Sequence, residues 1–282
     1  MHSTVAGMLI GFLSGIHAAS WGMYKDAPHE GFEIRKYLRS TLLGVAIGAF
    51  LPTALSLHVT TPNGVALLFG SAYVVERALA EIYKTFLRQE DQSKYSIPMQ
   101  FAVRGRVVRS RAARAALGIA YVGAMVAVVA SLAVWQRTHT GPLPLLVIAL
   151  LGAAGGWISA VGGAWKDAPV EGFQLLKFFR SPAIAALWAL LLARLTPSLP
   201  TIMLAATGYT IATTETWKTF CFPSHPRGKF AGKPVRFPAM LRLRQLVVPV
   251  YAAVWLVVLT ALGVSLVQAG PISRSGVESS HN

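Results

Sequence analysis

Acidic side chains are scarce in this sequence: Asp and Glu together number 11 in 282 residues, against 26 Lys and Arg. Charged residues of both signs make up 13% of the chain, whereas soluble domains carry roughly 25%. Hydrophobic residues make up 54%, and the mean hydropathy is +0.52. This balance excludes an ordinary soluble domain and favours a chain embedded in a membrane.

Cysteine is almost absent, and common nucleotide-binding, metal-binding and hydrolase motifs are missing. The single cysteine, Cys221, excludes an intrachain disulfide and a thiolate zinc cluster, and we interpret it as a small apolar filler. No GxxxxGK[ST], HExxH, GxSxG or GxGxxG pattern is present in a suitable context. His17 lies within an apolar stretch, and we predict that it makes a hydrogen bond between packed helices.

Apolar runs close to the roughly 20 residues that cross a ~30 Å hydrocarbon core recur along the chain. They predict an all-α polytopic membrane protein with about eight transmembrane helices, near 3–23, 41–58, 64–83, 113–135, 143–165, 182–197, 200–217 and 245–268. The first run resembles a secretory signal, but it has no basic residues before its apolar core, so we expect it to be retained as a span.

Lys and Arg gather in four segments, 25–39, 84–114, 166–180 and 218–244. Alternating the eight spans places all four segments on one side, which the positive-inside rule predicts to be the cytoplasm of a plasma (inner) membrane. Both termini then face outward, and the polar tail 269–282 is expected to be disordered. Anionic lipid head groups are the expected partners; nucleic acid is not, because no reading motif accompanies the charge.

One charged sequence segment, called here the repeated phrase, occurs twice in the chain. Lys25–Ser40 reads KDAPHEGFEIRKYLRS and Lys166–Ser181 reads KDAPVEGFQLLKFFRS, identical at ten of sixteen positions. EIYKTF at Glu81–Phe86 likewise returns as ETWKTF at Glu215–Phe220. We interpret the chain as a tandem duplication of a four-helix unit.

The first unit covers 1–136, with cytoplasmic loops at about 24–40 and 84–113, and the second covers 137–268, with loops at about 166–181 and 218–244. Four spans per unit give both units the same orientation, so a pseudo-two-fold axis along the membrane normal is predicted. Glycines spaced by four predict helix faces buried in protein: Gly7, Gly11 and Gly15 in the first unit, Gly152 and Gly156 in the second.

The repeated charges are the candidate site. Asp26 precedes Ala-Pro, which predicts the N-cap of a short amphipathic helix with Asp26 and Glu30 one turn apart. Glu81 lies just inside an apolar span, where a carboxylate needs a partner, and Lys84 stands at i+3. The candidate residues for substrate or ion binding, or for gating, are Asp26, Glu30, Arg39, Glu81 and Lys84, with Asp167, Glu171, Arg180, Glu215 and Lys218 at the matching places.

Two interpretations of these charges stay open: a Glu–Lys tie that only stabilises each unit, or one half-site from each unit. No cofactor motif is evident, although the oxygens of Asp26, Glu30 and Glu81 are ligands that a divalent metal prefers. Three functions remain: a transporter or channel-like protein, which we favour, a membrane enzyme acting on a lipid or polyprenyl phosphate, and a non-catalytic scaffold. The sequence names neither a substrate nor an oligomeric state.

Overall fold

The computed structural model describes residues 2–270, without 96, 98, 104, 105, 140, 142 and 226, and without the side chains of 94, 166, 167, 169 and 171. From residue 271 on, the tail that the sequence predicts to be disordered lies outside the described residues. The statements below refer to the described part of the chain.

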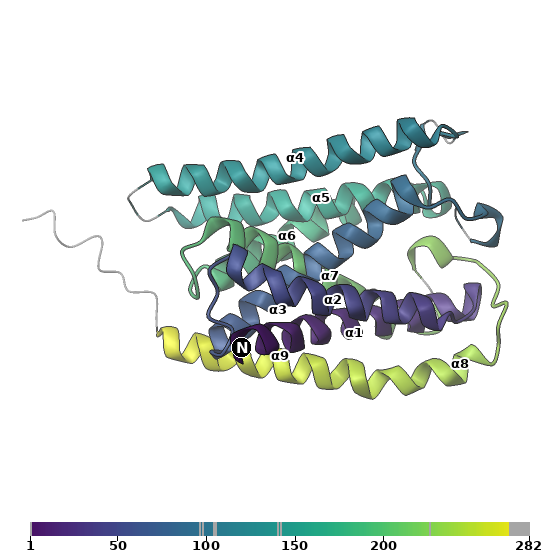
Figure 1. Cartoon of the computed structure of the whole chain (residues 1–282). Helices are drawn as coiled ribbons and strands as arrows, with labels where there is room; N and C mark the ends of the chain where they lie inside the picture. The colour runs from purple at the N-terminus through teal and green to yellow at the C-terminus, as the bar shows by residue number, and fades with distance from the viewer. Residues whose placement is uncertain are drawn as a thin grey trace, which may run out of the picture.

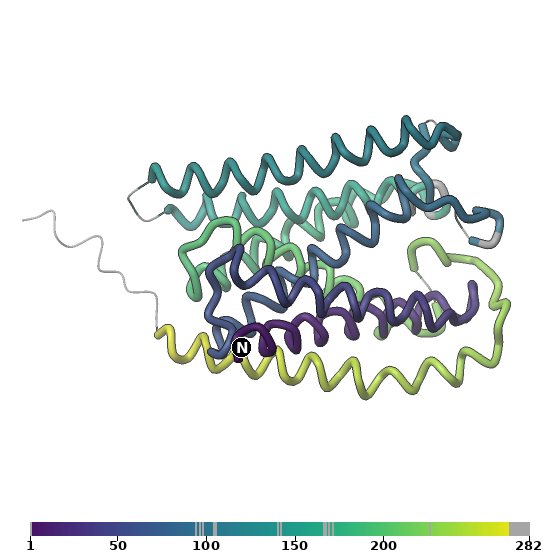
Figure 2. The backbone as a smooth tube through the Cα atoms, in the orientation of Figure 1, coloured from purple at the N-terminus to yellow at the C-terminus, as the bar shows by residue number. Residues whose placement is uncertain are grey.

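Eight long helices run up and down through the described chain (Figures 1 and 2). They are α1 (His2–Glu30), α2 (Ile34–Ala54), α3 (Pro62–Ile82), α4 (Arg111–Thr138), α5 (Leu145–Glu171), α6 (Leu175–Leu192), α7 (Leu199–Phe220) and α9 (Val248–Ala269). A short helix α8 (Met240–Leu243) and the 3-10 turn η4 (Arg244–Val247) lead into α9. Three helices begin with a typical N-cap residue: the side chains of Thr61, Ser110 and Ser198 each accept a hydrogen bond from the backbone amide three residues further on.

The connections at one end of the bundle are longer and carry their own small elements. A π-helical turn η1 (Tyr83–Leu87) extends α3, and a 3-10 turn η2 (Gln92–Lys94) follows it. A hairpin of β1 (Ala102–Val103) and β2 (Arg106–Val107) precedes α4, and η3 (Gly228–Phe230) lies between α7 and α8. Apart from this hairpin, the described chain forms helices and their connections, as predicted.

Six helices of the described chain are long and apolar enough to cross a bilayer: α1, α2, α4, α5 as far as Trp165, α6 and the stretch Met240–Ala269. The protein is therefore a helical membrane protein. The other two long helices, α3 and α7, are the innermost, and their large side chains Phe69, Tyr73, Ile202 and Tyr209 are almost completely buried. Because neighbouring helices cover α3 and α7, neither helix needs an apolar outer face.

The centre of the bundle is tightly closed between α3 and α7. A Cβ atom added at Gly208 would overlap the carbonyl oxygen of Gly70, and one at Gly70 would lie 2.8 Å from the carbonyl oxygen of Ala205. The two backbones therefore touch. Tyr209 also donates a hydrogen bond of 2.8 Å to the carbonyl oxygen of Ala66 across the same contact.

The glycine stripes pack each half's first helix against its second. Cβ atoms added at Gly7, Gly11 and Gly15 would overlap the carbonyl oxygens of residues 48, 44 and 40 of α2. In α5, Cβ atoms at Gly152 and Gly156 would lie 2.5 and 2.6 Å from the carbonyl oxygens of residues 185 and 181 of α6. The prediction that these faces are buried in protein is confirmed.

The predicted helix start at Asp26 is wrong. Helix α1 continues through Asp26 and Pro28 to Glu30, and Gly31 then turns the chain at φ +81°. Pro28 has no N–H to give to the carbonyl oxygen of Tyr24, and Arg244 donates to that oxygen instead, at 3.4 Å. A distant arginine thus satisfies the carbonyl oxygen that Pro28 leaves free. The predicted amphipathic segment after Gly31 is the start of α2.

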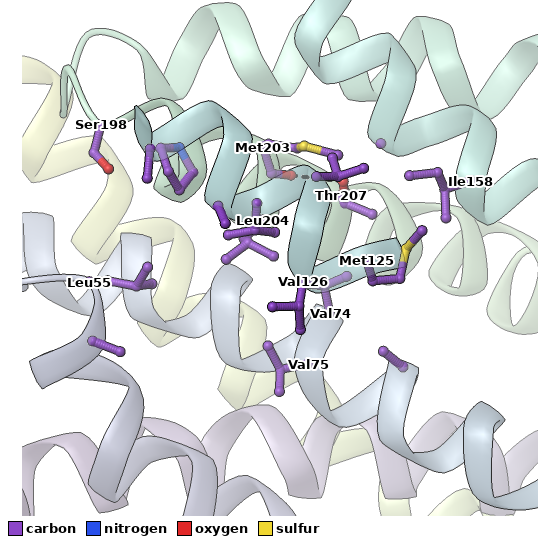
Figure 3. Close-up of a pocket in the computed structure, with 18 of the residues that line it drawn as sticks. Leu55, Val74, Val75, Met125, Val126, Ile158, Ser198, Met203, Leu204 and Thr207 are labelled. Atoms are coloured by element: carbon purple, nitrogen blue, oxygen red, sulfur yellow. Dashed lines mark hydrogen bonds between the residues drawn. The ribbon is translucent and has the colours of Figure 1, made fainter. Parts of the chain in front are cut away.

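Helix α4 lies at the edge of the bundle (Figure 1). Its buried residues are Arg114 and Gly118, both near its start, whereas α9 has buried residues along most of its length. Between α4 and the α3–α7 pair lies a cavity of about 880 Å³, called here the apolar cavity; Val74, Met125, Leu204 and Thr207 are among its walls (Figure 3).

Candidate functional site

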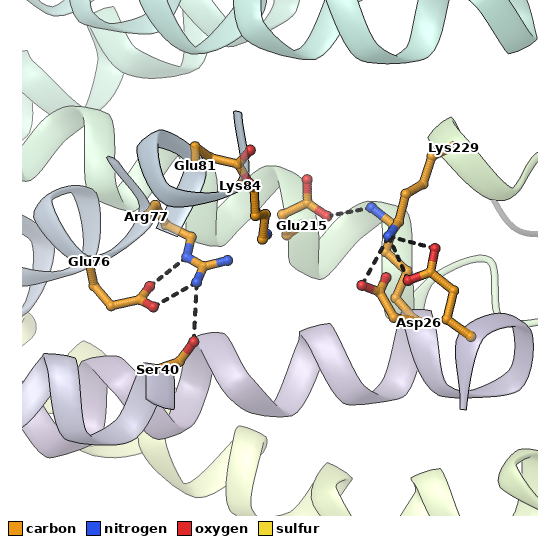
Figure 4. A network of polar contacts seen from close by, with 10 residues as sticks. Asp26, Ser40, Glu76, Arg77, Glu81, Lys84, Glu215 and Lys229 are labelled. Atoms are coloured by element: carbon orange, nitrogen blue, oxygen red, sulfur yellow. Dashed lines mark hydrogen bonds and ion pairs between the residues drawn. The ribbon is translucent and has the colours of Figure 1, made fainter. Parts of the chain in front are cut away.

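The basic connections lie together at one end of the bundle, called here the basic end. The α1–α2 turn and the segments 83–110 and 221–239 meet there, while the N-terminus of α1 and the end of α9 lie at the opposite end (Figure 1). A row of ion pairs at and just below the basic end joins these elements (Figure 4).

The deepest ion pair of this row joins two neighbours in the chain. Glu76 is 0% exposed, and Arg77 donates to both of its carboxylate oxygens, with 2.7 Å from Nη2 to Oε1. Nη2 of Arg77 also donates to the hydroxyl of Ser40, the last residue of the repeated phrase, at 3.3 Å. A buried carboxylate is tolerated when its charge and lone pairs are matched in this way.

The two predicted Glu–Lys ties are confirmed. Lys84 donates to Glu81 at 3.2 Å, and Lys218 donates to Glu215 at 3.1 Å. Both pairs use the i,i+3 spacing that places side chains on one face of a helix. Glu81 and Glu215 are thus each paired with the lysine three residues on.

Other ion pairs run between the two halves of the chain. Lys25 of α1 donates to Glu215 of α7 at 3.2 Å. Lys229, in the turn η3, contacts Asp26 at 3.1 Å and Glu30 at 3.4 Å (Figure 4). The end of α1 in the first half is therefore fixed to the end of α7 and the loop after it in the second.

Beside this row lies a cavity of about 290 Å³, called here the charged cavity. Its lining has six basic side chains, four acidic ones, and Tyr95 and Met99; the charged members are Arg35, Lys36, Arg39, Lys84, Arg88 and Lys229, and Asp26, Glu30, Glu33 and Glu90. Most come from the first half, and Lys229 comes from the second. The structure thus brings Asp26, Glu30, Arg39 and Lys84 of the predicted site together.

Two arginines of the charged cavity have unused donors. The Nε atoms of Arg39 and Arg88 are buried and have no hydrogen-bond partner among the described residues. Arg88 is 5% exposed, and its guanidinium lies 4.0 Å from the ring centre of Tyr95. Sequence analysis missed Arg88, because the second half has Phe222 at the matching position and the charge is therefore not repeated.

The corresponding positions of the second half carry less charge. Arg180 lies over the ring of Trp217, at 5.1 Å, as Arg39 lies over Tyr83 at 5.5 Å. By the alignment of the two phrases, however, Leu176 stands where the first half has Arg35, and Phe222 where it has Arg88. The side chains of the predicted residues Asp167 and Glu171 lie outside the described residues.

The shared metal site is not supported. In the described chain, no group of three or more His, Cys, Asp or Glu side chains is arranged to hold a metal ion. Asp26 and Glu30 face Lys229, whereas Glu81 pairs with Lys84. Asp26 and Glu30 thus share one lysine, whereas Glu81 is held by another.

Two residues that the sequence analysis singled out lie outside this row of charges. His17 is buried, its Nδ1 lies 3.1 Å from the hydroxyl of Tyr73, and its ring stacks on Tyr251 with 3.9 Å between ring centres. The predicted hydrogen bond between helices is therefore confirmed. Cys221 is exposed, so its interpretation as a buried apolar filler is wrong; it follows the last residue of α7, where the chain leaves the bundle.

Compared with known proteins, the chain matches no family model, no curated protein and no solved structure.

Proposed function

We propose that the protein binds the phosphate-bearing head group of an anionic lipid in the charged cavity. The observation that carries this proposal is that three arginines, Arg35, Arg39 and Arg88, line one cavity together with three lysines. Guanidinium groups match phosphate oxygens in geometry and charge. Six basic against four acidic side chains leave the lining with a net charge of +2, close to the opposite of the −1.5 to −2 of a phosphate monoester at neutral pH.

A lipid is favoured over a soluble anion by the position of the cavity. Helix α1 has 29 residues, about 43 Å at ~1.5 Å per residue, so it outruns a ~30 Å hydrocarbon core. Its last turn, with Asp26 and Glu30, then lies at head-group level. Exposed apolar residues beside the cavity, Phe32, Ile34 and Leu38, suit contact with the membrane interface.

The acidic residues of the cavity hold its bases in place. Lys229 is fixed by Asp26 and Glu30, which brings a base from the second half to a cavity of the first. Neutralising these carboxylates would release Lys229 and open the contact between halves. In this scheme the acids position a base and do not contact the ligand.

The duplicated architecture is part of the proposal. The two halves share the Glu–Lys ties, the arginine over an aromatic ring and a positive-φ glycine after the first helix. We assign them to one ancestral four-helix unit, with eight spans, basic loops in the cytoplasm and both termini outside. In this proposal Arg35 and Arg88 form a binding site in the first half only, although the two halves otherwise share the same order of helices.

The test compares binding of phosphatidic acid and phosphatidylcholine to the purified protein, with bound lipids counted by native mass spectrometry. Arg88→Gln or Arg39→Gln should weaken phosphatidic acid binding roughly ten-fold or more, because a charge-assisted hydrogen bond is lost. Arg227→Gln is the matched control, since Arg227 lies at the same end over Trp217 and Phe222 and does not line the cavity. Equal binding by all variants, or no preference for phosphatidic acid, would contradict the proposal.

Transport remains a second candidate, because the ion pairs of Lys25 with Glu215 and Lys229 with Asp26 join the two halves and would act as latches. A path along the axis needs α3 and α7 to separate, since Gly70 and Gly208 close it here. Solute uptake by vesicles that contain the protein tests this function; uptake equal to that of empty vesicles would exclude it.

A further inference from the structure

The apolar cavity crosses the bundle beside α4 and ends among polar groups. Aliphatic side chains of α3, α4 and α7 form most of its wall, and Thr207 satisfies its own hydroxyl by donating to the carbonyl oxygen of Met203 at 2.8 Å (Figure 3). Gln136, Arg137, Thr196 and Ser198 line it where α4 ends and α7 begins, which is the end of the bundle opposite to the basic end. Its apolar wall suits the hydrocarbon chain of a lipid, and its polar end suits the head group.

Elsewhere in the bundle, aromatic residues of α1, α3 and α9 fill the place that corresponds to the apolar cavity. His17 and Phe69 pack there against Trp255, with ring centres 5.2 and 6.4 Å apart, and Tyr73 and Tyr251 complete the cluster. The repeated phrases align α1 with α5 and α3 with α7, and Arg114 and Tyr121 align with Arg244 and Tyr251. The positions that match His17, Phe69, Tyr73, Tyr251 and Trp255 are then Ile158, Met203, Thr207, Tyr121 and Met125, and all five line the apolar cavity.

The cavity therefore occupies the place of an aromatic cluster. Thr207 and Met125 are smaller than Tyr73 and Trp255, and Gly162 stands where the first half has Trp21. The aromatic residues of α9 pack against neighbouring helices. In contrast, α4 has no buried residue beyond Gly118 in the described chain. The smaller side chains leave space that α4 does not fill.

We infer that the apolar cavity binds one hydrocarbon chain of a bilayer phospholipid, with the phosphate of that lipid beside Arg137. An empty apolar space of this size forfeits dispersion contacts on all its walls, and water would find few partners in it. Membrane hydrocarbon surrounds this part of the bundle, because the outer face of α4 is exposed at Ile119 (74%) and Val134 (59%). Arg137 supplies the positive charge that a phosphate requires.

The test counts lipids that stay on the purified, detergent-washed protein by native mass spectrometry. The wild-type protein should retain one phospholipid in the apolar cavity, in addition to any phosphatidic acid in the charged cavity. Replacing Met125→Trp together with Thr207→Tyr restores the side chains of the matching positions and fills the cavity, so occupancy should fall at least ten-fold. Ile119→Trp, on the exposed face of α4 and outside the cavity, should retain the lipid. Arg137→Gln should lose the preference for phosphatidylglycerol over phosphatidylcholine.

Two results would overturn the inference. One is a wild-type protein that keeps its helical circular dichroism after washing but holds no lipid. The other is a filled variant that holds as much lipid as the wild type. If the double variant does not fold, the inference is tested by comparing the number of lipids bound to the wild type and to Met203→Phe, which introduces the larger side chain of the matching position, Phe69. Arg88→Gln separates the two sites, since it should remove phosphatidic acid from the charged cavity and leave the chain-bound lipid in place.

Discussion

Two carboxylates with different surroundings show how single charges are tolerated in this protein. Glu76 is completely buried, and both its oxygens are held by Arg77. Glu33 has a side chain that is 47% exposed, and its partner Lys36 is also accessible to solvent. Removing one partner of a buried pair leaves an uncompensated charge, whereas an exposed pair is replaced by water.

Glu76→Gln is therefore expected to destabilise the protein by roughly 3 kcal/mol, because it leaves Arg77 buried without a counter-charge. Glu33→Gln, the matched control, should change the free energy of unfolding by less than about 1 kcal/mol. Titration with SDS in mixed micelles measures both values. Equal effects of the two substitutions would mean that the Glu76–Arg77 pair does not stabilise the bundle.

Sequence reasoning found the ion pairs that lie within one helix and missed those that join distant segments. The tie of Lys84 to Glu81 follows from i,i+3 spacing. Lys25 and Glu215 are 190 residues apart, and Lys229 and Asp26 are 203 apart, so no local rule connects them. The charged cavity depends on these long-range contacts and on Arg88, and for that reason it was not predictable.

At the scale of the helix, glycine decides how closely α1 approaches α2. A Cβ atom at Gly11 would overlap the carbonyl oxygen of Gly44, whereas one at Gly22 of the same helix meets no atom within 4 Å. Without a hydrophobic drive between helices in lipid, such close backbone contact supplies the packing energy. The two glycines thus provide a matched pair for a test.

Gly11→Ala should destabilise the protein by about 1–3 kcal/mol, since the two helices must move apart to admit the methyl group. Gly22→Ala should be neutral or stabilise it by up to about 1 kcal/mol through helix propensity. Thermal unfolding in detergent, followed by circular dichroism, ranks the two variants against the wild type. A Gly11→Ala protein as stable as Gly22→Ala would show that α1 and α2 are not held by this contact.

Helix positions were predictable from apolar runs, but helix ends were less so. Spans near 64–83 and 113–135 correspond closely to α3 and α4. The end of α1 was misplaced, because Asp26 before Ala-Pro has the pattern of a helix start, and the rule takes no account of Arg244, which satisfies the carbonyl that Pro28 leaves free. A tertiary contact thus overrode a local signal.

For the whole molecule, the two proposed repeat units carry different side chains at positions that the alignment of the repeated phrases matches. The first half lines the charged cavity with Arg35 and Arg88, where the second has Leu176 and Phe222. The second half contributes Ile158, Met203 and Thr207 to the apolar cavity, where the first has His17, Phe69 and Tyr73. Departures between otherwise matching positions, rather than the matches, therefore mark both proposed ligand sites.

The orientation of the bundle is testable with the native cysteine. Cys221 is exposed and lies at the basic end, so the positive-inside rule predicts that it faces the cytoplasm. A membrane-impermeant maleimide should label it in inside-out vesicles and not in right-side-out vesicles. Cys221→Ser combined with Thr138→Cys moves the thiol to the exposed end of α4 at the opposite end of the bundle, and the labelling pattern should reverse. Labelling of both thiols from the same side would mean that α4 and α7 do not cross the membrane as the alternating helices require.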